Sequence, residues 1–120
     1  MADQDIFSIE RIGTTMLVEP LRNISSLAES DVKPELDSML AALEDAELAN
    51  IVVDFAAVSY FGSSMLEALR RLWNQIHDRT GGMALCNVSD IGREVLHVTR
   101  FDTLWTIYES RDEALASFQK

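Results

Sequence analysis

The stretch Asn50-Ile51-Val52-Val53-Asp54-Phe55 decides the fold class of this chain. Its apolar residues follow one another without the alternation that a half-exposed strand would show. Such a run is typical of a central strand in a parallel sheet that helices cover on both faces. A second apolar run, Met83-Ala84-Leu85-Cys86, comes after a helical pattern that begins near Ser64. This strand–helix–strand order predicts an α/β fold.

Patterns outside these two runs extend the alternation to the whole chain. We expect strands over about residues 7–11, 16–20, 50–55, 83–86 and 104–108. We expect helices over about residues 31–45, 64–80, 89–98 and 110–118, the first capped by Asp31, the third by Ser89 or Asp90 and the last by Ser110. Arg22 to Glu29 should form a loop, and Thr80-Gly81-Gly82 should end the second helix. The order predicts one domain over residues 1–120, a mixed and mostly parallel sheet covered by about four helices.

Acidic residues outnumber basic residues by 20 to 10, which gives a formal net charge of -10. That charge repels phosphate backbones and anionic lipid heads, so nucleic acid and membrane surfaces are poor candidate partners. It would steer the protein toward a basic protein surface. An acidity that serves only solubility is the alternative interpretation.

Cys86 is the only cysteine and lies in an apolar run. A single thiol cannot form an internal disulfide, which fits a reducing compartment, and we expect this thiol to be buried and inert. No apolar stretch approaches the ~20 residues that span a bilayer. The segment Met1-Ala2-Asp3-Gln4-Asp5 lacks the basic region of a secretory signal. We therefore expect a cytoplasmic protein without membrane insertion.

Two serines follow Gly62 at the start of the second helical pattern. Ser64 and Glu67 have capping-box spacing, so we expect the Ser64 hydroxyl to accept from the backbone N–H of Glu67 and the Glu67 side chain to reach back. Ser63 would then lie just outside the helix, beside backbone N–H groups that favour an anion. A phosphate on Ser63 would be stabilised there. The alternative is that both serines only cap the helix.

The connection after Phe55 leaves the carboxyl end of a central strand, which is where open α/β sheets form sites. It contains two aromatic residues, Tyr60 and Phe61. Because alternate residues point in opposite directions, we expect one to pack into the core and the other to be free to contact a partner.

The sequence offers little support for catalysis. Residues 62–66 read Gly-Ser-Ser-Met-Leu, which is not the G-x-S-x-G pattern of serine hydrolases. Both histidines, His77 and His97, fall on expected helices away from the strand ends. Asp54 ends a buried strand, as the phosphorylated Asp of receiver domains does, but no acidic pair and no late-strand lysine accompany it. Metal-ligand spacing is absent from the sequence. We therefore expect no enzyme, no metal and no cofactor.

Residues 51–61 and the Gly62-Ser63-Ser64-Met65-Leu66 that follows resemble the STAS domain family, and within it the bacterial anti-sigma factor antagonists. The family typically has Asp-Ser-Ser-Gly-Leu at the second of these stretches. The resemblance resumes at residues 82–87, 93–96, 101–105 and 114–115. It covers about residues 50–118 well, whereas residues 1–49 agree only in element order. It implies a single STAS-like domain.

The resemblance also implies a regulatory protein-binding module. In the family, the first serine of the pair accepts phosphate from a serine kinase that is also the anti-sigma factor, and this role falls on Ser63. The unphosphorylated antagonist binds the kinase and frees the sigma factor, and a serine phosphatase resets it. We expect the partner to dock at the start of the second helix, on Ser59, Tyr60, Phe61, Gly62, Ser63, Ser64, Met65 and Glu67.

Three positions depart from the family pattern. Gly62 replaces the Asp that precedes the serines, Met65 replaces the glycine that follows them, and Arg100 stands where a glycine often closes the third helix. The second candidate function is therefore a STAS scaffold, or an accessory subunit of a signalling or transport complex, that has no phosphorylation switch.

Overall fold

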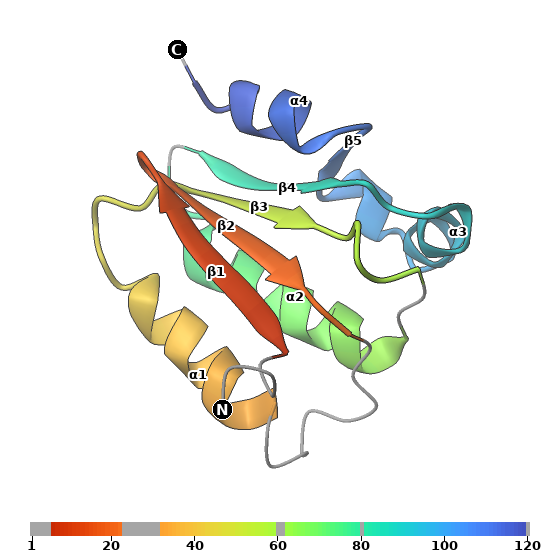
Figure 1. Cartoon of the computed structure of the whole chain (residues 1–120), viewed down its shortest axis with the longest axis horizontal. Helices are drawn as coiled ribbons and strands as arrows, with labels where there is room; N and C mark the ends of the chain where they lie inside the picture. The colour runs from red at the N-terminus through yellow and green to blue at the C-terminus, as the bar shows by residue number, and fades with distance from the viewer. Residues whose placement is uncertain (1–5, 23–31, 60–61, 80, 120) are drawn as a thin grey trace.

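The computed structural model describes residues 6–22, 32–59, 62–79 and 81–119, and over these residues it shows one five-stranded sheet with covering helices (Figure 1). The strands are β1 (Phe7–Ile12), β2 (Thr15–Pro20), β3 (Asn50–Asp54), β4 (Gly82–Cys86) and β5 (Thr106–Tyr108). The helices are α1 (Val32–Ala42), α2 (Ser63–Ile76), α3 (Asp90–Val98) and α4 (Arg111–Ala116), with a 3-10 turn at Phe101–Thr103. The predicted α/β class is confirmed.

The five strands lie in the sheet in the order in which they occur along the chain. β1 pairs antiparallel with β2, and each later pair is parallel, so the sheet is mixed and mostly parallel, as predicted. In β3, Ile51 lies opposite Met16 of β2 and Met83 of β4. Because β2 to β5 run in the same direction, their carboxyl ends share one edge of the sheet.

Each central strand has apolar side chains on both faces. All five residues of β3 are buried, which confirms the interpretation of the continuous run. One face packs against α1 and α2 in the larger core, which includes Ile51 and Val53. The other face, with Val52, packs against α4 around Ala114. Figure 1 shows α1 and α2 on one side of the sheet and α4 on the other.

Two predicted boundaries are wrong. α2 ends at Ile76 with His77 as its right-handed C-cap, so the glycines do not close it. They serve the start of β4 instead: a Cβ on Gly81 would lie 1.4 Å from Oδ1 of Asn50, and Gly82 has a φ of +150°. The last strand is also shorter than predicted, because the chain before it forms the 3-10 turn and buries Trp105. Asp31 and nearly all of the loop at 22–29 lie outside the described residues.

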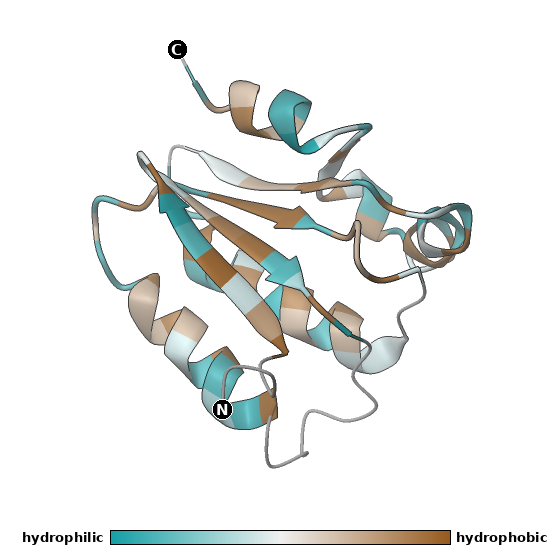
Figure 2. Ribbon diagram, in the orientation of Figure 1, coloured by the Kyte–Doolittle hydropathy of each residue, from teal (hydrophilic) through white to brown (hydrophobic). Residues whose placement is uncertain are grey.

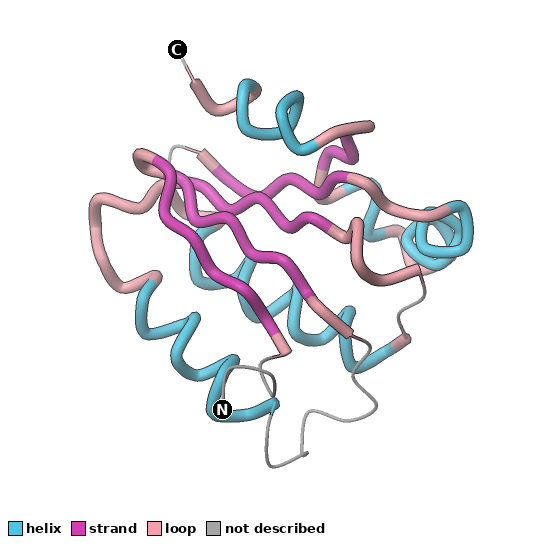
Figure 3. The backbone as a smooth tube through the Cα atoms, viewed as in Figure 1, coloured by secondary structure: helices cyan, strands magenta, loops and turns pink. Residues whose placement is uncertain are grey.

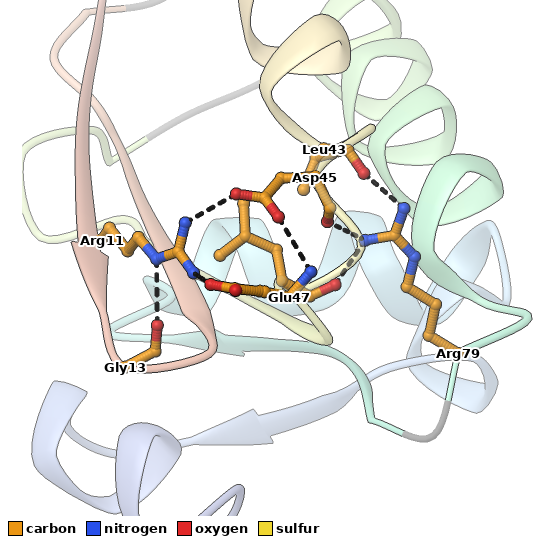
Figure 4. A network of polar contacts seen from close by, with 7 residues as sticks. Arg11, Gly13, Leu43, Asp45, Glu47 and Arg79 are labelled. Atoms are coloured by element: carbon orange, nitrogen blue, oxygen red, sulfur yellow. Dashed lines mark hydrogen bonds and ion pairs between the residues drawn. The ribbon is translucent and has the colours of Figure 1, made fainter.

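Two arginines hold the amino-terminal edge of the sheet together (Figure 4). Arg11 of β1 contacts Asp45 at 2.8 Å and Glu47 at 2.9 Å, in the connection between α1 and β3. Hydrogen bonds from the backbone N–H of Glu47 and from Arg11 lower the pKa of Asp45. Arg79, just after α2, donates to three carbonyl oxygens of the same connection, those of Leu43, Asp45 and Leu48. This edge is therefore fixed by polar contacts, and it lies at the opposite end of the strands from the serine pair.

Candidate functional site

Ser63 is the first residue of α2, and its side chain is exposed. Gly62 precedes it in an extended conformation (φ -113°, ψ -154°) and acts as the N-cap. The carbonyl oxygen of Gly62 accepts the first helical hydrogen bond, from the backbone N–H of Leu66 at 3.1 Å. The first N–H groups of a helix have no partner within the helix. The Ser63 hydroxyl therefore lies at the positive end of the α2 dipole.

The predicted capping box at Ser64 and Glu67 is wrong. The helix begins at Ser63, so Ser64 lies inside its first turn, and no side chain hydrogen bond caps Gly62. Glu67 does not reach back but pairs with Arg71 one turn further on, at 3.3 Å. The N-cap position falls on Gly62, two residues earlier than the Ser-x-x-Glu pattern indicates, so the Ser64 side chain lies past the position from which it could cap the helix. Both serines are thus free of a capping role.

The loop between β3 and α2 is anchored by its own residues and by its neighbours. Phe55 and Val58 are buried, and the backbone N–H of Phe55 donates to the carbonyl oxygen of Cys86 at 3.0 Å. Ser89, the N-cap of α3, donates its hydroxyl proton to the carbonyl oxygen of Ser59. Figure 3 shows this loop running toward the start of α3 before the chain enters α2. The loop that leads to Ser63 therefore lies at the carboxyl edge of the sheet, where the sequence predicts a site.

A buried carboxylate lies behind this loop. Asp54, at the end of β3, accepts hydrogen bonds from the backbone N–H of Ala56 at 2.9 Å and from the side chain of Asn87 at 3.0 Å. Arg111 of α4 pairs with it at 2.7 Å and with Glu19 of β2 at 3.2 Å. Burial raises the pKa of Asp54, but these hydrogen bonds and the guanidinium charge outweigh it, so the pKa lies below its usual range. The sequence pointed to Asp54 only as a receiver-like acid. In the structure it joins the end of β3 to Arg111 of α4 and to Asn87, just past β4.

Cys86 is fully buried, as predicted. Burial and the nearby Asp54 carboxylate raise the pKa of its thiol to about 12. The thiolate is the nucleophile and the metal ligand, so a thiol with this pKa is poorly suited to either role at neutral pH.

The residues expected to meet a partner have different degrees of exposure. Ser59, Ser63 and Glu67 are exposed, while Gly62 and Ser64 are half-buried. Met65 is fully buried in the larger core, so it supports α2 from below and offers no contact surface. Tyr60 and Phe61 lie outside the described residues.

The two histidines lie away from Ser63. His77, past the far end of α2, stacks on Trp73 with ring centroids 4.6 Å apart. His97 of α3 lies 3.0 Å from Asp102 and is exposed. Within the described residues, no group of three or more His, Cys, Asp or Glu side chains could hold a metal ion. None of the described helices is long and apolar enough to cross a membrane.

The family model of the STAS domain matches residues 8–114. The chain belongs to the STAS domain family. The match includes β1, β2 and α1, where the sequence resemblance had reached only the order of elements. The serine pair and the buried run before it therefore lie inside the matched STAS domain.

Relatives of this STAS domain carry regulatory names. BtrV of Bordetella bronchiseptica, provisionally named an anti-sigma factor antagonist, is 26% identical over 104 residues, which are 87% of each chain. The solved structure of an anti-sigma-factor antagonist (STAS) domain protein from Planctomyces limnophilus is 30% identical, with a TM-score of 0.78 over 95% of this chain and 98% of that one. The phosphorylated form of SpoIIAA, a Bacillus cell fate determinant, has the same fold, with a TM-score of 0.70 at 19% identity over 94% of this chain and 99% of that one.

Proposed function

We propose that this STAS domain is an anti-sigma factor antagonist that binds an anti-sigma factor kinase and is switched by phosphorylation of Ser63. The observation that carries the proposal is the position of Ser63, exposed at the first residue of α2 after an extended glycine. The role is regulatory: Ser63 is the substrate of another protein's kinase, and a serine phosphatase reverses the change. Such a circuit acts on transcription and operates in the cytoplasm.

The start of α2 suits a phosphate. The backbone N–H groups of the first turn and the helix dipole both favour an anion at this position. Gly62 places no carboxylate before the serine, so the phosphate meets no like charge from its chain neighbour. The acidic Glu67 is turned toward Arg71. A phosphate on Ser63 would therefore leave the domain folded.

The same phosphate would oppose docking. It adds roughly -1.5 to -2 charge and strongly hydrated oxygens to a surface that must lose water when a partner binds. Unphosphorylated Ser63 presents only a small hydroxyl. The switch thus acts on the interface and needs no refolding of the antagonist. The names of BtrV and of the Planctomyces limnophilus protein support the antagonist role, and a phosphorylated form is known of SpoIIAA.

The test uses the purified serine-kinase anti-sigma factors of the same organism. Each is incubated with the protein and ATP, and phosphate is located by mass spectrometry of peptides. Binding is then measured for wild type, Ser63→Ala, Ser63→Asp and the neighbouring control Ser64→Ala. We expect phosphate on Ser63 alone, wild-type binding by both alanine variants and clearly weaker binding by Ser63→Asp.

Two results would contradict the proposal. Phosphate on Ser64 or elsewhere would place the switch at another residue. Equal binding by all four proteins without phosphate incorporation would favour the scaffold or accessory role, which needs the STAS surface but no switch.

A further inference from the structure

The outward face of α3 carries exposed aliphatic side chains. Ile91 is 56% exposed and Val98 is 72% exposed, and the half-buried Val95 lies between them. Their spacing of four and then three residues places them on one side of the helix. Together with Glu94 and Thr99 they line a shallow hollow of about 290 Å³. We call Ile91, Val95 and Val98 the α3 strip. Figure 2 shows that α3 carries hydrophobic residues among hydrophilic ones.

The core of the domain accounts for only part of this strip: Val95 packs partly against the larger core, whereas Ile91 and Val98 are exposed. α3 is held mainly by an adjacent side, where Gly92 and Leu96 are buried. Single exposed aliphatic residues are ordinary on protein surfaces, but neighbouring ones that line a hollow mark an interaction site more often than chance placement does.

The α3 strip is continuous with the surface that carries Ser63. Ser89 caps α3 by accepting from the backbone N–H of Gly92 at 3.0 Å, and the same hydroxyl donates to the carbonyl oxygen of Ser59. The first turn of α3 therefore abuts the loop that leads into α2. A protein that covers Ser63 and extends over Ser59 would reach the first turn of α3, where the α3 strip begins.

The charges around the α3 strip are unbalanced. Asp90 and Glu94 are exposed, and neither forms an ion pair with the described part of the chain. The basic Arg93 of the same helix is already paired with Glu109, at 3.2 Å. His97 is likewise paired with Asp102. Of the described residues, Glu94 is the only charged one that lines the hollow, and Asp90 lies one turn before it, while the exposed Arg100 lies beyond the other end, next to Val98. The acidic side of the hollow is thus the one toward the start of α3, and it complements lysine or arginine.

We propose that the α3 strip is the second half of the docking surface for the anti-sigma factor kinase that reads Ser63. This inference rests on the proposed function. The hollow would take an apolar side chain of the kinase, and Asp90 and Glu94 would face basic residues beside it. A second copy of this chain fits less well, because each copy carries a net charge of -10 and would bring acidic rims together.

The experiment compares matched pairs of variants in binding to the purified serine-kinase anti-sigma factor by calorimetry. Val98→Ser removes a strip residue, and Ile9→Ser removes an exposed aliphatic side chain of β1, 45% exposed, as its control. Glu94→Lys reverses a rim charge, and Glu10→Lys makes the same charge change on β1. We expect Val98→Ser and Glu94→Lys to weaken binding by about tenfold or more, while both controls bind like wild type.

The outcomes separate a role of the α3 strip in kinase binding from the proposed function of Ser63 and from dimerisation. If Ser63→Asp weakens binding but Val98→Ser and Glu94→Lys do not, the α3 strip is not part of the interface and the proposed function stands. If the controls on β1 weaken binding equally, the effect is general and the assignment to α3 falls. If wild type binds no anti-sigma factor but sediments as a dimer that Val98→Ser dissociates, the strip joins two copies and both proposals fall.

Discussion

The Nε atom of Arg111 lies 2.7 Å from Oδ2 of Asp54 and joins the start of α4 to the carboxyl end of β3, across 57 residues of sequence. The same guanidinium reaches Glu19 of β2 at 3.2 Å. Asp54 is 2% exposed, so its charge depends on this partner and on the hydrogen bonds from Ala56 and Asn87. α4 is short, and this ion pair joins its first residue to the sheet, beside the apolar packing of Ala114.

Replacing Arg111 should therefore be costly. Arg111→Ala leaves the buried Asp54 carboxylate with only its two neutral donors, and we expect the free energy of unfolding to fall by about 1–3 kcal/mol. The control is Arg93→Ala, which breaks the exposed pair with Glu109 and should cost less than about 1 kcal/mol. Urea denaturation measures both. Equal losses would mean that the Arg111–Asp54 pair contributes no more than a surface ion pair.

The lowered pKa of Asp54 makes stability depend on pH. The pKa is lower in the folded state than in the unfolded state, where it is about 3.9. The unfolded state therefore binds the proton more readily, and the stabilisation is full above that pH and is lost as pH falls through the folded pKa. We expect wild type to be more stable than Asp54→Asn at neutral pH and the gap to narrow in acid. A gap that stays constant from pH 7 to pH 3 would contradict this.

Cys86 should be inert in the native protein. Its pKa of about 12 leaves almost no thiolate at neutral pH, and its side chain is fully buried. We expect labelling by a thiol reagent to proceed only at the rate at which the protein opens, and to become fast in urea. Mass spectrometry of the native protein checks this, and rapid labelling without denaturant would show that β4 is accessible at its carboxyl end.

The pattern Ser-x-x-Glu occurs near the start of α2 and at the start of α4, but only in α4 does its serine cap the helix. Ser110 caps α4 by accepting from the backbone N–H of Glu113 at 3.2 Å, whereas neither Ser63 nor Ser64 caps α2. We expect Ser110→Ala to lower the free energy of unfolding by about 0.5–2 kcal/mol. Ser63→Ala and Ser64→Ala should change it by less than about 0.5 kcal/mol, since alanine favours helix and no cap is lost. An equal loss of stability for Ser64→Ala and Ser110→Ala would show that Ser64 does cap α2, as the sequence pattern predicts.

Some features of this fold follow from the sequence pattern and others do not. The continuous apolar run of β3 predicts a strand buried on both faces, because burial is a property of the run itself. The patterns Ser64-x-x-Glu67 and Ser110-x-x-Glu113 are alike, yet only the second caps a helix. The difference is where each helix begins: Ser110 is itself the N-cap of α4, whereas the N-cap of α2 is Gly62, two residues before Ser64.

Contacts between residues far apart in the sequence cannot be predicted from local patterns either. Asp54 was noticed because it ends a buried strand, but nothing local names Arg111 as its partner. A general rule would have helped: a carboxylate at the end of a fully buried strand requires a cation or several donors. Likewise, nothing local distinguishes the apolar residues of α3 that face the core from those that do not, and the structure buries Leu96 but turns Ile91 and Val98 outward.

Arg100 closes α3 in the left-handed conformation, with a φ of +66°, where the family often has glycine. A side chain with a Cβ is strained there, by about 1–2 kcal/mol, while glycine is not. Part of the stability gained by placing glycine there is lost, because glycine adds conformational freedom to the unfolded chain. We therefore expect Arg100→Gly to raise the free energy of unfolding by about 0.5–1 kcal/mol. Arg100→Ala is the control, since it removes the charge and keeps the Cβ, and it should give no gain. Urea denaturation of the three proteins measures the difference between glycine and alanine, and equal stabilities for the two variants would show that the backbone at position 100 relaxes without cost.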